Sequence, residues 1–393
     1  MKSQYFIRKT ITFCGLIAAI FLLVIGCTRT PQQGQPGGPA PGVVEIWHSL
    51  QGVESEALQG QIQAITKTHP EVIIKLKYVP EPNFAAFSYQ AEAGGEGPEI
   101  FIASKEIIRQ LYEHGALAKI AYNDQEAFPA ALSAFKFGGV AYASPWLTDV
   151  PLLYFRTDTA SVPANLEDLF SNKGGTSLAA PDMAALSAWW NGSGGRLVNA
   201  GKPVLDEPLN VAFLKQILTW QTAKSLRLDP SVVATFSGGG TRFMIAGASQ
   251  AKALTEQNIP WGCMQLVELV GGQGQPLLGT TLGIANSAIK TNAAMSPAIK
   301  TVEKALLTSE VEGAMLKAGH LLPANMGYYK LPEAQKGVFP QANIAFAKAW
   351  ALEGDALELK LIPLQNAAWN NALTGTSTPE EALARAQAAA IKP

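Results

Sequence analysis

Two groups of side chains that could hold a small ligand follow predicted strands near the start of the chain. The first predicted strand, residues 43–47, ends in Trp47 and is followed by His48, Ser49 and Gln51. The third predicted strand, residues 99–103, is followed by Ser104, Lys105 and Glu106. Ligands of open α/β sheets bind outside the carboxyl ends of the strands. We therefore expect both groups at a binding site, with hydroxyl, charged and aromatic groups combined.

Each group also has a purely structural interpretation. Trp47 could belong to the core, with His48 serving as a cap. Ser104 could cap the helix that begins at Lys105, with Glu106 near its positive end. These structural roles remain open, and the capping role is compatible with ligand binding.

The chain contains eight tryptophans, and a flat ring beside carboxylates or amides suits a sugar. Rings cover the apolar C–H faces of a sugar, whereas carboxylates and amides bind its hydroxyl groups. Trp189 and Trp190 are adjacent, so in a helix they point roughly 100° apart and at most one faces a ligand. Further candidates are Trp146, Asp149, Asn325 and Trp369.

Strands and helices alternate in the segments that would position these residues. The helix after the first strand repeats Leu58, Ile62 and Ile65 at helical spacing, and Pro70 ends it. The stretch EVIIKLKYVP alternates as a strand does, and KEIIRQLYEHG forms an amphipathic helix. Later segments indicate a hairpin in KFGGVAYASPW, a strand in VPLLYFRTD and a helix over residues 209–227. This order predicts a parallel or mostly parallel sheet covered by helices.

Length and composition favour a large folded protein. The chain has 393 residues, 48% of them hydrophobic and 16% charged, which suits two domains rather than disorder. The net charge is −1 with no basic run, so a nucleic-acid surface is not expected. Four histidines show no metal spacing, and we expect neither a metal nor a cofactor.

The amino-terminal region has the layout of a secretory signal. Positive charges at Lys2, Arg8 and Lys9 precede an uncharged run, residues 10–26, that stops at Cys27. The stretch VIGC resembles the lipobox of bacterial lipoproteins, which implies cleavage before Cys27 and lipid on its sulfur. The alternative is a transmembrane anchor, and either places the rest outside the cytoplasm. Residues 28–42 are rich in proline and glycine, which predicts a flexible tether.

Four longer segments resemble the family 1 extracellular solute-binding proteins, the group that includes maltose-binding protein. They are VEIWHSLQGVESEALQGQIQAITKTHPEVIIKLKYVP, GEGPEIFIASKEIIRQLYEHGALAKI, FGGVAYASPWLTDVPLLYFRTD and TSTPEEALARAQAAA. The resemblance implies an α/β fold of the periplasmic-binding-protein kind, type II, with two lobes joined by crossover hinge strands. It implies one lobe of residues 43–147 plus 285–330 and another of residues 152–280 plus 331–393. Hinges are expected at residues 144–150 and 279–284.

The same resemblance implies a role and further site residues. It implies a periplasmic or cell-surface monomer that captures a di- or oligosaccharide between its lobes and delivers it to the permease subunits of an ABC importer. Asp149 matches an acid that binds sugar hydroxyls in the family, and Asp182 lies in a loop that supplies an acid or a ring. Ser249 and Gln250 stand where some relatives carry a stacking tryptophan, which weakens the case for maltodextrin itself.

Other functions remain open at this point. A glycerol-phosphate-type solute or a peptide is the alternative ligand, although phosphate would favour clustered arginines. A sensor built on the same fold is a further alternative. Ser249-Gln250-Ala251-Lys252 fits the Ser-x-x-Lys pattern of penicillin-recognising enzymes, but the Ser-Asp-Asn and Lys-Thr-Gly elements are missing from the sequence. We therefore expect a binding protein rather than an enzyme. We also expect Asp149→Ala, or loss of Trp146, to weaken ligand binding with little change in the fold.

Overall fold

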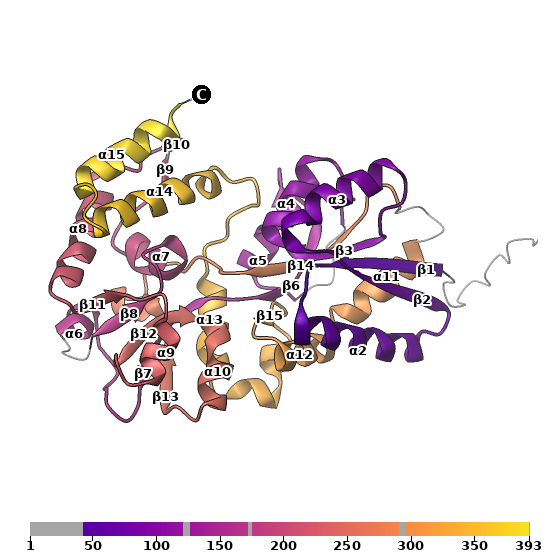
Figure 1. Ribbon diagram of the computed structural model, residues 1–393, viewed down its shortest axis with the longest axis horizontal. Helices are drawn as coiled ribbons and strands as arrows, with labels where there is room; N and C mark the ends of the chain where they lie inside the picture. Colours follow the sequence, from indigo (N-terminus) through magenta and orange to yellow (C-terminus); the bar gives the residue numbers. More distant parts are fainter. Residues whose placement is uncertain (1–41, 121–125, 172–174, 291–295, 393) are drawn as a thin grey trace, which may run out of the picture. The chain divides into compact units, whose positions relative to one another are not determined.

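The computed structural model describes residues 42–120, 126–171, 175–290 and 296–392 (Figure 1). The signal, Cys27 and all but the last residue of the expected tether lie outside these ranges. That last residue, Gly42, belongs to the first strand rather than to the tether. Within the described ranges, the helices are too short or too polar to cross a membrane.

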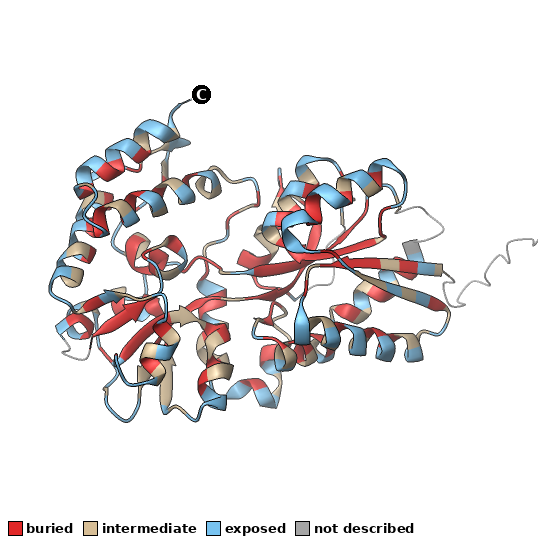
Figure 2. Cartoon of the chain, in the orientation of Figure 1, coloured by how far each residue is buried: buried red, intermediate tan, exposed pale blue. Residues whose placement is uncertain are grey.

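The first sheet has six strands in the order β15-β6-β14-β3-β1-β2. They are β1 (Gly42–His48), β2 (Val72–Tyr78), β3 (Ile100–Ser104), β6 (Ala143–Thr148), β14 (Thr281–Asn286) and β15 (Leu322–Pro323). Strand β1 is parallel to β2 and β3, as the βαβ pattern predicts, but β14, β6 and β15 are paired antiparallel. The sheet is therefore mixed, and the expectation of a mostly parallel sheet holds only for its first three strands. All residues of β3 are buried, which is typical of a strand covered on both faces (Figure 2).

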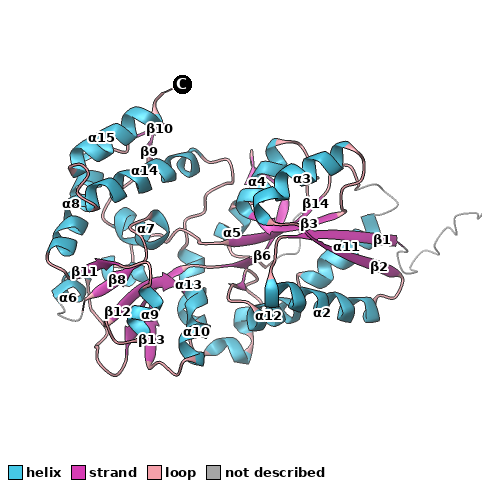
Figure 3. Cartoon of the chain, viewed as in Figure 1, coloured by secondary structure: helices cyan, strands magenta, loops and turns pink. Residues whose placement is uncertain are grey.

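Helices cover both faces of this sheet (Figure 3). They are α2 (Gly52–Thr68), α3 (Glu81–Ala93), α4 (Lys105–Glu113), α5 (Pro129–Ser133), α11 (Ser296–Leu306) and α12 (Ser309–Ala318). Helix α2 buries Leu58, Ile62 and Ile65, so the periodicity identified its inner face correctly. The predicted hairpin is also confirmed, as β4 (Lys136–Phe137) and β5 (Val140–Ala141) pair antiparallel.

The second sheet has five strands in the order β11-β8-β12-β7-β13. They are β7 (Pro151–Arg156), β8 (Thr176–Leu178), β11 (Leu226–Leu228), β12 (Phe243–Gly247) and β13 (Trp261–Met264). Strand β8 is parallel to β11 and β12, while β7 runs antiparallel to β12 and β13. The short strands β8, β11 and β13 have no clear alternation, and the sequence pattern did not single them out.

A longer set of helices and a small hairpin accompany the second sheet. The helices are α6 (Leu166–Ser171), α7 (Met183–Gly192), α8 (Pro208–Thr222), α9 (Val232–Ser237), α10 (Ala251–Glu256), α13 (Phe339–Lys348), α14 (Leu357–Leu373) and α15 (Pro379–Ala390). The hairpin consists of β9 (Val198–Asn199) and β10 (Lys202–Pro203), and short 3-10 turns include η2 (Ala248–Gln250) and η3 (Leu266–Val270). The helix expected over residues 209–227 ends earlier, because Lys224 has a φ of 60° and the chain then enters β11.

The chain passes between the two sheets by short connections inside one compact unit, residues 41–393. Only Asp149 and Val150 separate β6 of the first sheet from β7 of the second. The return passes through residues 277–280, since residues 281–286 already form β14. Gly283 therefore lies within a strand, where an added Cβ would come 2.6 Å from the ring of Phe135. Close packing against Phe135 explains why position 283 is a glycine, so this residue need not be a point of hinge rotation.

Candidate ligand site

Two adjoining cavities lie where the connections between the sheets meet helices α4, α7 and α14. The crossover cavity has a volume of about 540 Å³ and is lined by both connections, by Lys105, Glu106 and Asp182, and by Ile362 and Asn366 of α14. The aromatic cavity has a volume of about 490 Å³ and is lined by three aromatic residues, Tyr112, Phe137 and Trp350. Both are lined by Lys105, Glu106, Leu277, Leu278 and Ile362, so a single ligand could occupy the two together.

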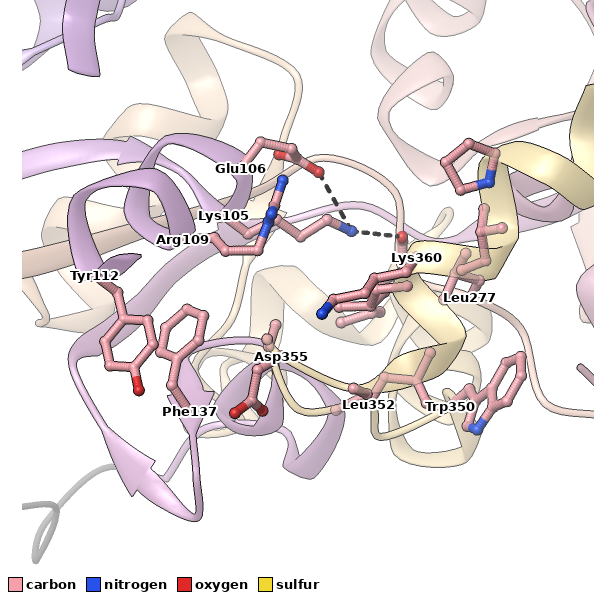
Figure 4. Close-up of a pocket in the computed structure, with 18 of the residues that line it drawn as sticks. Lys105, Glu106, Arg109, Tyr112, Phe137, Leu277, Trp350, Leu352, Asp355 and Lys360 are labelled. Carbon is pink, nitrogen blue, oxygen red and sulfur yellow. Dashed lines mark hydrogen bonds and ion pairs between the residues drawn. The ribbon is translucent and has the colours of Figure 1, made fainter. Parts of the chain in front are cut away.

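The first turn of α4 supplies the charged pair shared by both cavities (Figure 4). Lys105 Nζ donates to the carbonyl oxygens of Leu278 at 3.4 Å and Gly279 at 3.3 Å, and lies 3.9 Å from the Glu106 carboxylate. Burial lowers the pKa of Lys105, and the nearby Glu106 opposes that shift. The Glu106 side chain is 58% exposed and so is available to a ligand. Ser104 is buried and donates to Glu81 Oε1 at 3.1 Å.

Asp149 lines the crossover cavity but is fully engaged by the protein. Its Oδ1 accepts from the backbone N–H of Val150 at 2.9 Å and of Ser249 at 3.0 Å, and its Oδ2 accepts from Ser249 Oγ at 2.6 Å. Burial raises the pKa of Asp149, while these hydrogen bonds counteract the shift. Its carbonyl oxygen also accepts from the Gly279 N–H at 2.9 Å, which ties the two connections together. Asp149 therefore has a clear structural role at the crossover.

The start of α7 and the middle of α14 meet on the opposite wall of the crossover cavity. Asp182 caps α7 by accepting from the Ala185 N–H at 2.9 Å, and burial raises its pKa. Asn366 Oδ1 accepts from the Met183 N–H at 2.9 Å. These bonds hold a carboxylate and an amide at the cavity wall, which are groups that bind hydroxyls.

The aromatic cavity combines rings with charges of both signs (Figure 4). Tyr112 stacks on Phe137 with ring centroids 4.3 Å apart and an interplanar angle of 14°. Trp350 is partly exposed, and its backbone N–H is anchored on the Pro276 carbonyl at 2.9 Å. The charged lining residues are Lys105, Glu106, Arg109, Glu113, Asp355 and Lys360. A partly exposed ring beside such groups can bind both the apolar and the polar side of a sugar.

Five tryptophans considered as ligand platforms lie in the core instead. Trp47, Trp146, Trp189, Trp190 and Trp369 are each at most 1% exposed. The indole N–H of Trp146 donates to the Leu306 carbonyl at 2.9 Å, and that of Trp189 to the Leu266 carbonyl at 3.0 Å. Trp190 donates to Asn210 Oδ1 and Trp47 to Glu45 Oε1. Because protein atoms cover their rings, we place all five in the core rather than at the site.

The polar residues at the end of β1 and just after it do not line either cavity. His48 is 2% exposed, burial lowers its pKa, and its Nδ1 has no hydrogen-bond partner in the described structure. The backbone N–H of Ser49 donates to the Ile102 carbonyl, and Gln51 is exposed at the start of α2. Asn325 is engaged in a turn, where its Oδ1 accepts from the Gly327 N–H at 2.7 Å.

The Ser-x-x-Lys pattern is not arranged for nucleophilic attack. Ser249 is 8% exposed and its hydroxyl donates to Asp149. Lys252 Nζ donates to the carbonyl oxygens of Lys317 at 2.8 Å and Ala318 at 3.2 Å, at the end of α12. Gln250, between them, is partly exposed and is absent from the lining of the two cavities. A serine acting as nucleophile needs a base within hydrogen-bond reach, and this lysine is engaged elsewhere.

Sequence reasoning missed most of the wall formed by residues 350–366. Trp350, Lys360 and Asn366 lie in a predominantly helical stretch without a strand end to mark them. One signal was present, since Ile362 and Asn366 are four residues apart and therefore share a face of α14. No local pattern showed that this face would lie opposite α4.

Solved structures with this fold include several sugar receptors. The GacH receptor of Streptomyces glaucescens, solved unliganded and with acarbose, is 20% identical, with a TM-score of 0.72 over 89% of this chain and 97% of that one. A cyclo/maltodextrin-binding protein complexed with maltotetraose is 17% identical, with a TM-score of 0.77 over 90% of this chain and 98% of that one. The maltose-maltodextrin binding protein of Alicyclobacillus acidocaldarius is 17% identical, with a TM-score of 0.71 over 89% and 100%. This chain therefore has the two-lobed α/β fold of maltose-binding proteins.

The sequence profile described as bacterial extracellular solute-binding protein matches residues 61–342, which is more than half of the chain. Members of this family bind solutes outside the cytoplasm and are not, as a family, enzymes. The chain belongs to the bacterial extracellular solute-binding protein family.

Proposed function

We propose that this protein captures a di- or oligosaccharide in the joined crossover and aromatic cavities. The observation that carries the proposal is the partly exposed Trp350 in the same cavity as the exposed carboxylate of Glu106. A sugar needs a flat apolar surface on one side and hydrogen-bonding groups at its rim, and the two cavities offer both. The fold shared with receptors solved with acarbose and with maltotetraose supports this ligand class.

Ligand binding is coupled to closure of two lobes in this proposal. We assign residues 43–147 plus 285–330 to one lobe and residues 152–280 plus 331–393 to the other. A ligand that contacts α4 on one side and α14 on the other binds the closed form better and so shifts the equilibrium towards it. Micromolar affinity corresponds to about −8 kcal/mol, which is within reach of ring stacking and several charge-assisted hydrogen bonds after the cost of closure.

The amino-terminal region completes the proposed function. A lipid on Cys27 would hold the mature chain at the membrane surface, with residues 28–41 as tether. The protein would then act as a monomer that delivers its solute to the permease subunits of an ABC importer. Mass spectrometry of the mature chain tests the anchor, because a lipidated Cys27 gives an amino-terminal peptide that Cys27→Ser lacks. An unmodified Cys27 in membrane fractions would contradict this part.

A ligand panel tests the main proposal. Purified protein is titrated calorimetrically with maltose, maltotriose, maltotetraose, acarbose, glycerol 3-phosphate and a short peptide. We expect at least one neutral or amine-bearing saccharide to bind one-to-one with micromolar or tighter affinity and to raise the melting temperature. Binding of none of the saccharides, with binding of the peptide or glycerol 3-phosphate, would contradict the sugar assignment but not family membership.

A further inference from the structure

The crossover cavity lies beside the first turns of two helices, yet each of these turns already carries a carboxylate. Helix α7 has its N-cap at Asp182, which accepts from the Ala185 N–H at 2.9 Å. Helix α4 carries Glu106 in its first turn. Helix N-termini ordinarily attract anions through their free N–H groups and their dipole. At α7 the carboxylate of Asp182 occupies that role, and at α4 the charge of Glu106 lies in the first turn.

A third carboxylate, that of Asp149, lines the same cavity. The Asp149 carboxylate accepts hydrogen bonds from the backbone N–H groups of Val150 and Ser249 and from the Ser249 hydroxyl. Three acidic side chains therefore line one cavity of about 540 Å³. They differ in solvent exposure: Asp149 and Asp182 are partly exposed, and Glu106 is exposed.

Positive charge in this cavity is limited to one ammonium group that already has partners. Lys105 is the one basic residue among the lining residues of the crossover cavity. Its Nζ is directed at the Leu278 and Gly279 carbonyls and lies 3.9 Å from Glu106. Three carboxylates against one ammonium give the lining a formal charge of −2 when all are ionised. An incoming phosphate, sulfate or carboxylate would find no arginine among these residues, and at α7 it would find a helix start already capped by Asp182.

We propose that the crossover cavity rejects anionic solutes and admits neutral or amine-bearing ones. This specificity rests on the proposed function and narrows its substrate class to glycosides without phosphate or carboxylate at the end that enters the cavity. Unlike charges attract and like charges repel more strongly where water is excluded, so a closing cleft amplifies the discrimination. Burial raises the pKa of both Asp149 and Asp182, and a cationic group bound beside them would relieve that cost.

Asp182→Asn is the sharpest test variant, because an asparagine oxygen can still accept the Ala185 N–H while the charge is removed. Asp168→Asn is the matched control. Asp168 is an exposed acid of the same lobe whose carboxylate accepts from the Ala164 N–H at 2.9 Å, and it lines neither cavity. Circular dichroism and melting temperature establish that both variants fold.

Calorimetry then compares inorganic phosphate and three ligand pairs, namely glycerol and glycerol 3-phosphate, glucose and glucose 1-phosphate, and maltose and maltose 1-phosphate. For any pair that binds, we expect the wild type to bind the phosphorylated member about 100-fold more weakly. In Asp182→Asn we expect this difference in affinity between the neutral and the phosphorylated member to shrink at least tenfold, or saturable binding of inorganic phosphate to appear. Asp168→Asn should behave as the wild type does. A wild type that binds a phosphorylated member as tightly as its neutral partner would overturn the inference.

The outcomes separate the inference from the proposed function. If no saccharide binds, the proposed function fails, and the inference is judged on inorganic phosphate alone. Phosphate binding gained in Asp182→Asn and absent from the wild type and Asp168→Asn would then support anion rejection. No difference between the two variants in any titration would overturn it.

Discussion

The crossover cavity and the aromatic cavity share a wall but offer a ligand different chemistry. The crossover cavity is lined by small and aliphatic residues with three carboxylates, and no aromatic ring is among its lining residues. The aromatic cavity has three rings and charges of both signs. The difference indicates how a sugar would be oriented, with its stacked face at Trp350 and its most polar end at the start of α7. Lys105 and Glu106, common to both, would contact the middle of such a ligand.

The largest expected effect on ligand affinity comes from removing the ring of Trp350 from the aromatic cavity. Trp350→Ala is expected to weaken saccharide binding about 30-fold, or about 2 kcal/mol, as for an aromatic anchor in an interface. Trp350→Phe should restore part of the affinity because a smaller flat ring remains. Titration calorimetry measures both. Trp220→Ala serves as control, since Trp220 lies in a separate surface groove with Phe170. Equal losses of saccharide affinity in Trp350→Ala and Trp220→Ala would contradict a specific role of the aromatic cavity.

The next effect concerns stability and the crossover cavity. Asp149→Ala leaves two backbone N–H groups and the Ser249 hydroxyl without their acceptor. Each buried group that loses its partner costs about 1–3 kcal/mol, so we expect the free energy of unfolding to fall by at least 2 kcal/mol. Chemical denaturation measures this loss. The expectation from sequence was the reverse, with affinity lost and the fold kept. Unchanged stability with lost affinity would restore that view.

A smaller effect is expected from the residue that both cavities share. Glu106→Gln keeps the size of the side chain and removes the charge that can accept from sugar hydroxyls. We expect saccharide affinity to fall about tenfold, near 1.4 kcal/mol, which is typical for a charged hydrogen bond. The matched control is Glu56→Gln, an exposed acid on α2 away from the cavities. Affinity unchanged in Glu106→Gln would remove α4 from the proposed contact surface.

The smallest effect is expected from a buried carboxyl outside both cavities. Glu312 is 1% exposed, and one of its oxygens has no hydrogen-bond partner among the residues that the structure describes. Burial holds its pKa well above the ordinary 4.5. A carboxyl with a raised pKa stabilises the fold most below its ordinary pKa, and this contribution is lost as pH rises through the raised value. Stability of the wild type should therefore decline over that range.

Glu312→Gln should make this decline smaller, because glutamine does not ionise. Between pH 4 and pH 8 we expect the variant to lose about 1 kcal/mol less free energy of unfolding than the wild type. Denaturation at pH 4 and pH 8 measures the change, and ligand affinity should be the same in the variant and the wild type. A decline of equal size in the variant would assign the pH dependence to other carboxyls, such as Glu303 and Glu92, whose pKa burial also raises.

Much of the fold could be predicted from the sequence, because the patterns that indicate helices and strands lie within short segments. The first βαβα segment followed from the spacing of Leu58, Ile62 and Ile65 and from the glycine breaks. The site was harder to predict, because the sequence pattern around a tryptophan near a strand end is the same whether its ring faces a ligand or the core. Trp47 and Trp146 are buried by contacts with distant segments, as the bond from Trp146 to the Leu306 carbonyl illustrates. Trp350 reaches its cavity only because α4 and the segment before α14 converge.

The most direct test of the account is a crystal structure of the protein with the tightest-binding saccharide of the panel. We predict that the sugar occupies both cavities, with one ring of the sugar against Trp350 and hydroxyl groups within hydrogen-bond distance of Glu106 and Asn366. The end nearest Asp182 should carry no phosphate or carboxylate. A saccharide bound at the groove of Phe170 and Trp220, with both cavities free of sugar, would contradict the central claim.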